Sequence, residues 1–434
     1  MIKKVIENFK KSLFFDLFRG FCVYLLKIKS QSEVKNSTNG TTETEKISRF
    51  LFLDSFRGLC AIIVMVGHSY NYFNDTPFYI HKYLIQVQLY GQTLAVNGFF
   101  ILSTFLLTYR LSTELIDLRF KSIRNVIIVL LKYFVRRFFR IYLVYVAFST
   151  LVKFGPKILG GFVNYKSGLF YPSWQDMVLL KSSGSSHLWT VPPEIKYYFV
   201  IPVICLPFLF HFKYTALFVL LTLLSTNYKW IMNKLVDRCD GFWDATCNIW
   251  ICVPIFLEGS ILGILILYLN RYFKQIFNLQ KLFSYLVDLL CYILIAIGII
   301  YNEYLTSWPI KSKSNLPGPS LVWLSVLFCM IISKTNTFKI YFFEKNAFLA
   351  WVGKISFGVY LFHPMSIQIV VFFKEKHPNI SNMLDLSILH ALICFFISWL
   401  FYVLVENNMI KLAKQICKLL DYFIIKTCPD LQSV

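Results

Sequence analysis

The stretch from residue 51 to residue 70 is apolar enough to span a membrane, yet it carries Asp54, Arg57 and His68. Eleven positions on an α-helix make about three turns, so Arg57 and His68 share one face about 16 Å apart. Ionisable groups within a span are costly and by default face a cavity where they act. The structural alternative is a solvated arginine at the helix end and a hydrogen-bonded histidine in the core.

A second group of cations, Arg136, Arg137 and Arg140, falls within about one helical turn before a later apolar run. Three guanidinium groups exceed what membrane topology requires, and arginine is the side chain best suited to bind phosphate through paired hydrogen bonds. The alternative is that these residues only mark the cytoplasmic end of a span.

Two further segments place polar groups in apolar surroundings. In HLWTVPPEIKYYF, which begins at His187, two prolines suit the first turn of a helix and Glu194 follows them. Glu194 either interacts with the helix dipole or extends toward His68. In ISFGVYLFHPM at 355–365, Pro364 frees a backbone carbonyl and can open a polar pocket beside His363.

The composition predicts a polytopic helical membrane protein. Of 434 residues, 57% are hydrophobic and only 15% are charged, whereas soluble domains are near one quarter charged. The net charge of +21 fits basic loops on the cytoplasmic side and predicts no nucleic-acid partner. The eleven cysteines show no zinc-type spacing, so we predict no metal site, and Cys239 and Cys247 either pair or stay free.

The fold class is therefore predicted to be all-α, a transmembrane bundle with a short interfacial helix near residues 13–26 and about ten spans. We divide the chain into a basic and polar tail (1–47), a transmembrane domain (48–410) and a basic cytoplasmic tail (411–434), with both termini in the cytoplasm. The expected spans are 50–72, 88–108, 138–154, 190–210, 212–228, 248–269, 282–301, 319–333, 348–373 and 386–405.

Taken together and in this order, these motifs resemble the acyltransferase-3 family of polytopic membrane enzymes. The resemblance covers about residues 48–410, and it departs from the family where Thr104 replaces a glycine and where Val-Pro-Pro precedes Glu194. The matching residues are Asp54, Arg57, Gly58, His68, Phe99, Phe100, Ser103, Phe105, Arg137, Arg140, His187, Trp189, Glu194, Tyr360, Leu361, His363 and Glu406.

The resemblance implies transfer of an acyl group from cytoplasmic acyl-CoA, with acetyl-CoA the expected donor, to a hydroxyl of a carbohydrate or lipid acceptor in the bilayer. Together with the residues it supports the hypothesis that His68 is the general base and that Glu194 orients His68 or the acceptor, and it implies no tightly bound cofactor. The remaining roles are donor binding for Arg57, Arg137, Arg140 and Ser103, and an acceptor pocket for His187, Trp189 and His363.

Two alternatives use the same residues. The intramembrane arginine, histidine and glutamate side chains can line the proton or substrate path of a multi-pass transporter. A catalytically silent membrane scaffold is the other alternative.

Overall fold

The computed structural model describes residues 51–73, 81–118, 123–158, 178, 180, 187–209, 247–272, 281–300, 319–333, 336, 339–377 and 383–427. These residues form helices joined by short connections, and no strand occurs among them, which confirms the all-α class. Five helical segments of this part are long and apolar enough to cross a membrane: Phe52–Ser69, Ala95–Ile116, His187–Leu209, Ala347–Lys376 and Asp385–Tyr422.

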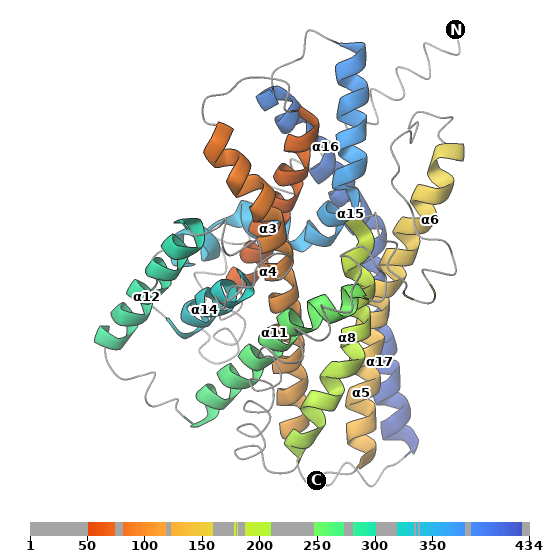
Figure 1. Cartoon of the computed structure of the whole chain (residues 1–434). Helices are drawn as coiled ribbons and strands as arrows, with labels where there is room; N and C mark the ends of the chain where they lie inside the picture. The colour runs from red at the N-terminus through yellow and green to blue at the C-terminus, as the bar shows by residue number, and fades with distance from the viewer. Residues whose placement is uncertain are drawn as a thin grey trace.

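Three long helices, α3, α4 and α15, form the centre of the bundle, with α12 and α14 on one side and α5, α8 and α17 grouped on another (Figure 1). The α-helices are α3 (Leu51–Phe73), α4 (His81–Ile116), α5 (Ile123–Arg137), α6 (Leu143–Ile158), α8 (Val191–Cys205), α11 (Cys247–Tyr272), α12 (Lys281–Ile300), α14 (Pro319–Ile332), α15 (Ala347–Lys376), α16 (Met383–Phe401) and α17 (Asn407–Thr427).

Shorter turns join or extend these helices. Two are 3-10 turns, η2 (His187–Thr190) before α8 and η3 (Leu206–Leu209) after it. Three are π-helical: η1 (Phe138–Tyr142) between α5 and α6, η5 (Lys339–Glu344) before α15, and η6 (Tyr402–Glu406) between α16 and α17.

Every predicted span except 212–228 overlaps a helix of the described chain. That segment and the interfacial helix predicted near 13–26 lie outside the described residues, so the count of ten spans stays a prediction. The segment predicted as a tail after residue 410 contains most of α17, which packs against α5.

The contact between α3 and α15 depends on two glycines. A Cβ on Gly58 would overlap the carbonyl oxygen of Leu349, and a Cβ on Gly353 would overlap the carbonyl oxygen of Asp54. Small residues at helix crossings allow the backbones to approach closely. The crossing places Arg57, next to Gly58, beside the α15 residues that follow Gly353.

The crossing of α4 and α11 accommodates Thr104, the residue that stands where the resembled family has glycine. The Thr104 hydroxyl donates a hydrogen bond to the carbonyl of Phe100 at 2.9 Å, so it is satisfied within its own helix. A Cβ on Gly259 of α11 would overlap that hydroxyl oxygen. The glycine of this crossing is therefore on α11 instead of α4.

We predict that Gly353→Ala destabilises the protein by about 1–3 kcal/mol, because the added methyl group meets backbone that cannot move aside. Thermal unfolding of the detergent-solubilised protein measures the loss. The control is Gly98→Ala, whose Cβ would meet the Cys60 sulfur at 3.1 Å, a side-chain contact that can adjust. Equal melting temperatures for wild type and Gly353→Ala would contradict the backbone contact.

Candidate active site

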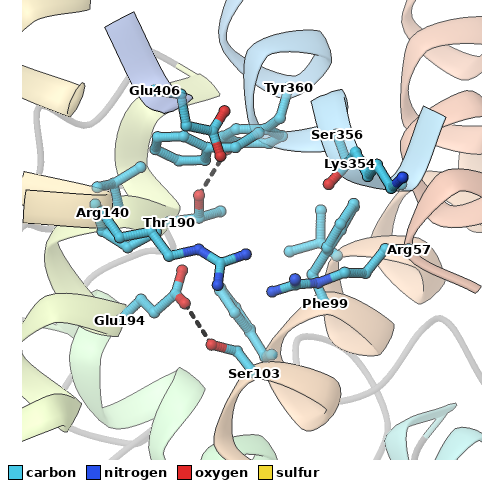
Figure 2. Close-up of a pocket in the computed structure, with 16 residues that line it drawn as sticks. Arg57, Phe99, Ser103, Arg140, Thr190, Glu194, Lys354, Ser356, Tyr360 and Glu406 are labelled. Carbon is cyan, nitrogen blue, oxygen red and sulfur yellow. Dashed lines mark hydrogen bonds between the residues drawn. The ribbon is translucent and has the colours of Figure 1, made fainter. Parts of the chain in front are cut away.

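A cavity of about 700 Å³, its opening included, lies between α3, α4, α8, α15 and the π-turns η1 and η6. Figure 2 shows the polar side chains that point into it. Its lining comprises Arg57, Val96, Phe99, Phe100, Ser103, Arg140, Ile141, Thr190, Val191, Glu194, Gly353, Lys354, Ser356, Phe357, Tyr360 and Glu406.

The guanidinium groups of Arg57 and Arg140 converge at the middle of the cavity from opposite walls (Figure 2). Among the described residues, neither is within ion-pair distance of a carboxylate. Their charges act on each other, and the negative charges of Asp54 and Glu194 act on Arg57 at longer range. Converging cations without a contacting counter-ion favour an anionic ligand between them.

Glu194 is fixed in the cavity by two hydroxyl groups. Ser103 Oγ and Tyr198 OH each donate a hydrogen bond to Glu194 Oε1 at 2.6 Å. Acceptance of two such bonds by one oxygen fits the ionised carboxylate. Glu194 lies in the first turn of α8, as the preceding prolines predict. Because both bonds go to Oε1, Oε2 is left for a molecule in the cavity.

The two π-turns each supply one charged residue to the cavity. Arg140 lies in η1 and Glu406 ends η6, and a single π-turn shifts the side chains after it relative to a regular α-helix. Glu406 is 3% exposed, and its Oε2 has no hydrogen-bond partner among the described residues. The charges of Arg140 and Arg57 act on its buried carboxyl group.

A cluster of histidine rings adjoins the cavity but does not line it. The His68 and His363 ring centroids are 4.9 Å apart, and those of His187 and His363 are 5.2 Å apart. Tyr360 separates this cluster from the cavity: its ring lies 5.8 Å from that of His187, and its hydroxyl is 2.7 Å from Thr190 Oγ1. The cavity and the cluster therefore share Tyr360 as a wall.

Backbone hydrogen bonds fix the orientation of two of these rings. Pro364 cannot donate an amide hydrogen to the carbonyl of Tyr360, and His363 Nδ1 donates to that carbonyl at 2.8 Å instead. His187 Nε2 donates to the carbonyl of Leu361 at 3.1 Å. In the neutral rings, His363 Nε2 and His187 Nδ1 are then hydrogen-bond acceptors. Both are buried without a partner in the described part of the chain.

The structure brings together some of the residues predicted from sequence and separates others. Arg57, Arg140, Ser103 and Glu194 line the cavity, whereas Arg137 lines a smaller neighbouring pocket.

The remaining predicted residues lie beside the cavity. His68, His187 and His363 form the cluster, and Trp189 packs edge-on against Phe100 of the cavity wall, with ring centroids 6.4 Å apart. Of the two residues predicted to be catalytic, Glu194 therefore lines the cavity, whereas His68 lies in the histidine cluster.

Several residues that line the cavity or bond to its lining were not predicted to have a role. Tyr198 follows Glu194 by four positions on one helix, a spacing from which a contact can be predicted. Lys354, Thr190 and Ser356 have no comparable spacing in the sequence that would predict a contact. Glu406 was matched to a motif of the resembled family, but no role was assigned to it. No group of three or more histidine, cysteine, aspartate or glutamate side chains in the described ranges is arranged to hold a metal ion.

Comparison with known proteins identifies the class. A family model described as an acyltransferase domain, that of acyltransferase family 3, matches residues 50–405. The chain therefore belongs to the acyltransferase-3 family, which confirms the resemblance, and with its apolar helices it is an integral membrane protein with an acyltransferase domain. No curated protein and no solved structure matches the chain.

We predict that Ser103→Ala and Tyr198→Phe each slow acyl transfer, because each removes one donor that holds Glu194. A hydrogen bond to an ionised group contributes about 1.5–3 kcal/mol, so the rate is expected to fall roughly 10- to 100-fold. Transfer of a labelled acyl group by membranes containing each variant measures the effect.

The control is Thr113→Val, which removes a hydroxyl that bonds only within α4, to the carbonyl of Tyr109 at 2.8 Å. It should leave the rate unchanged. Wild-type rates in both cavity variants would show that the Glu194 position does not matter for transfer.

Proposed function

We propose that this protein transfers an acyl group, with acetyl the expected one, from cytoplasmic acyl-CoA to a hydroxyl of a carbohydrate or lipid acceptor. Family membership supports acyl transfer. The observation that carries the choice of donor is the convergence of Arg57 and Arg140 in one cavity without a contacting carboxylate among the described residues.

The lining of the cavity suits the two parts of such a donor. Arg57 and Arg140 present guanidinium groups that match phosphate oxygens through charge-assisted bonds. Val96, Phe99 and Phe357 provide an apolar wall for the pantetheine arm and the acyl chain. An acyl-CoA combines these two requirements in one molecule.

The histidine cluster suits an acceptor that carries hydroxyl groups. His187 Nδ1 and His363 Nε2 are unpartnered acceptor nitrogens, and the hydroxyls of a sugar or a lipid headgroup donate to such atoms. His68, in ring contact with His363, is within reach of the same hydroxyls. We assign the acceptor to this side of Tyr360 and the donor to the cavity side.

In the proposed reaction His68 removes the proton from the acceptor hydroxyl, since a neutral imidazole accepts a proton at its unprotonated ring nitrogen and suits a general base. The acceptor oxygen forms a bond to the thioester carbonyl carbon, and the carbon–sulfur bond breaks. CoA leaves as a thiolate, which takes up the proton. Glu194 orients the reacting groups from the cavity side. The acyl group moves from the donor in the cavity, past the Tyr360 side chain, to the acceptor beside the histidine cluster.

The proposed orientation places the Arg57 end of α3 at the cytoplasmic face and His68 further toward the opposite face. It rests on the basic segment at 109–140 and the basic residues after Glu406, which mark the cytoplasmic side in multi-pass proteins. Donor and acceptor would then arrive from opposite sides of the membrane.

We predict that His68→Ala lowers acyl transfer by about 10²- to 10⁴-fold, the usual contribution of a general base, while the protein still accumulates in membranes. Mass spectrometry of glycans and lipids from cells expressing each variant measures the acylated product. The control is His377→Ala, an exposed histidine at the end of α15 that stacks only on Phe373.

A parallel Glu194→Gln variant distinguishes the two candidate bases. Full transfer by His68→Ala together with none by Glu194→Gln would assign proton removal to Glu194 and refute the role of His68. Movement of a solute by the wild-type protein without release of CoA would favour the transporter instead.

A further inference from the structure

A second, smaller pocket of about 230 Å³, the open solvent at its mouth included, lies beside the cavity at the junction of α4 and α5. It is rich in arginine and contains one carboxylate, so its ionisable lining carries a net charge of plus two. The lining residues are Leu107, Arg110, Leu111, Glu114, Tyr133, Arg136 and Arg137.

Glu114 holds two of the arginines in place around the pocket. Arg110 Nε donates to Glu114 Oε1 at 2.8 Å, and Arg136 Nη1 donates to the same oxygen at 3.0 Å. Each guanidinium group uses one nitrogen in this contact, and Arg136 also bonds to Cys417 of α17, while a guanidinium offers five N–H donors in a rigid plane. The carboxylate therefore orients both groups and leaves further donors for a ligand.

The third arginine of the pocket has an unused donor. Arg137 Nε is buried and has no hydrogen-bond partner among the residues that the structure describes. Arg137 also feels the repulsive charges of Arg140 and Arg57. A buried donor without a partner, on a cation surrounded by other cations, is stabilised by an anion in the pocket.

We propose that this pocket binds a phosphate monoester. Such a group carries a charge of about −1.5 to −2 at neutral pH and three strong acceptor oxygens, which matches the charge of the lining and its several free donors. The two sources of this chemistry are the phosphate on the ribose of CoA and the phosphate of a lipid headgroup. The first source rests on the proposed function.

The position of the pocket favours the CoA phosphate. Ser103 of the cavity and Leu107, Arg110 and Glu114 of the pocket follow one another on one face of α4, and seven residues from Ser103 to Arg110 span about 10 Å. Arg137 and Arg140 likewise connect the two sites along α5 and η1. A nucleotide with phosphates at two positions can occupy both sites at once.

The test compares binding of CoA and 3′-dephospho-CoA to the purified full-length protein by titration calorimetry. We expect the wild type to bind CoA about tenfold or more tightly than dephospho-CoA, as expected for loss of one charge-assisted contact. Arg136→Gln should bind both equally. Arg110→Gln, at a more exposed position, provides a second variant if Arg136→Gln fails to fold.

The matched control is Lys132→Gln. Lys132 lies one turn before Arg136 on α5 and pairs with Asp421 of α17 outside the pocket. The Lys132→Gln variant loses the same single positive charge as Arg136→Gln and should keep the preference for CoA over dephospho-CoA. A second arm measures the melting temperature in nanodiscs with and without phosphatidic acid, whose headgroup is a phosphate monoester.

The outcomes separate the inference from the proposed function. If the wild type binds both nucleotides equally, and phosphatidic acid raises the melting temperature of the wild type but not of Arg136→Gln, the pocket binds a phosphate monoester that a lipid supplies. If both nucleotides bind equally and phosphatidic acid does not change the melting temperature, the proposed phosphate site is wrong. Binding of CoA would in that case still support acyl-CoA as the donor. If the wild type does not bind CoA, the proposed donor fails and the lipid arm alone decides on the pocket.

Discussion

The close contact between the backbones of α3 and α15 is the constraint on which the site depends. Gly58 and Gly353 remove the side chains that would otherwise separate the two helices. α3 carries Arg57 and His68, and α15 carries Tyr360 and His363. One helix crossing therefore fixes both the cationic end of the site and the imidazole end. Backbone-to-backbone contact of this kind is rigid, which suits groups that must be held to within a fraction of an ångström.

Around this crossing, charged side chains and neutral polar side chains occupy different places. The cavity contains arginine, lysine and glutamate, and the neighbouring cluster contains histidine rings whose orientation is set by backbone carbonyls. Tyr360 separates the two, with its hydroxyl at hydrogen-bond distance from Thr190. In the proposed function, the charged groups bind the ionic donor and the histidines bind the uncharged hydroxyls of the acceptor. The charged residues come from α3, η1, α8, α15 and η6, and the histidines come from α3, η2 and α15, so several elements together make this division.

Much of the site could be predicted from the sequence because its residues lie on regular helices. The apolar run at 51–70 correctly placed Arg57 on a long helix, and the two prolines before Glu194 correctly marked the start of α8. The carbonyl that Pro364 was predicted to free is also observed, since His363 Nδ1 donates to the carbonyl of Tyr360, while α15 continues unbroken and His363 does not line the cavity.

Other features depend on tertiary structure that helical periodicity does not encode. No local signal marks a π-turn, so the arrival of Arg140 and Glu406 in one cavity could not be predicted. The position of His68 against His363, and not in the lining of the cavity that Arg57 lines, depends on how α15 packs against α3. The separation of Arg137 from Arg140 into two pockets has the same origin.

The pairing of Thr104 with Gly259 has a consequence for how sequences of this kind are compared. A Cβ on Gly259 would overlap the Thr104 hydroxyl, and it would also lie 2.5 Å from the carbonyl oxygen of Ile101. A glycine at 104 would therefore not release the requirement for glycine at 259, because the backbone of α4 still excludes a side chain there. A departure from the family pattern at 104 thus leaves the close approach of the two helices intact, since that approach depends on position 259.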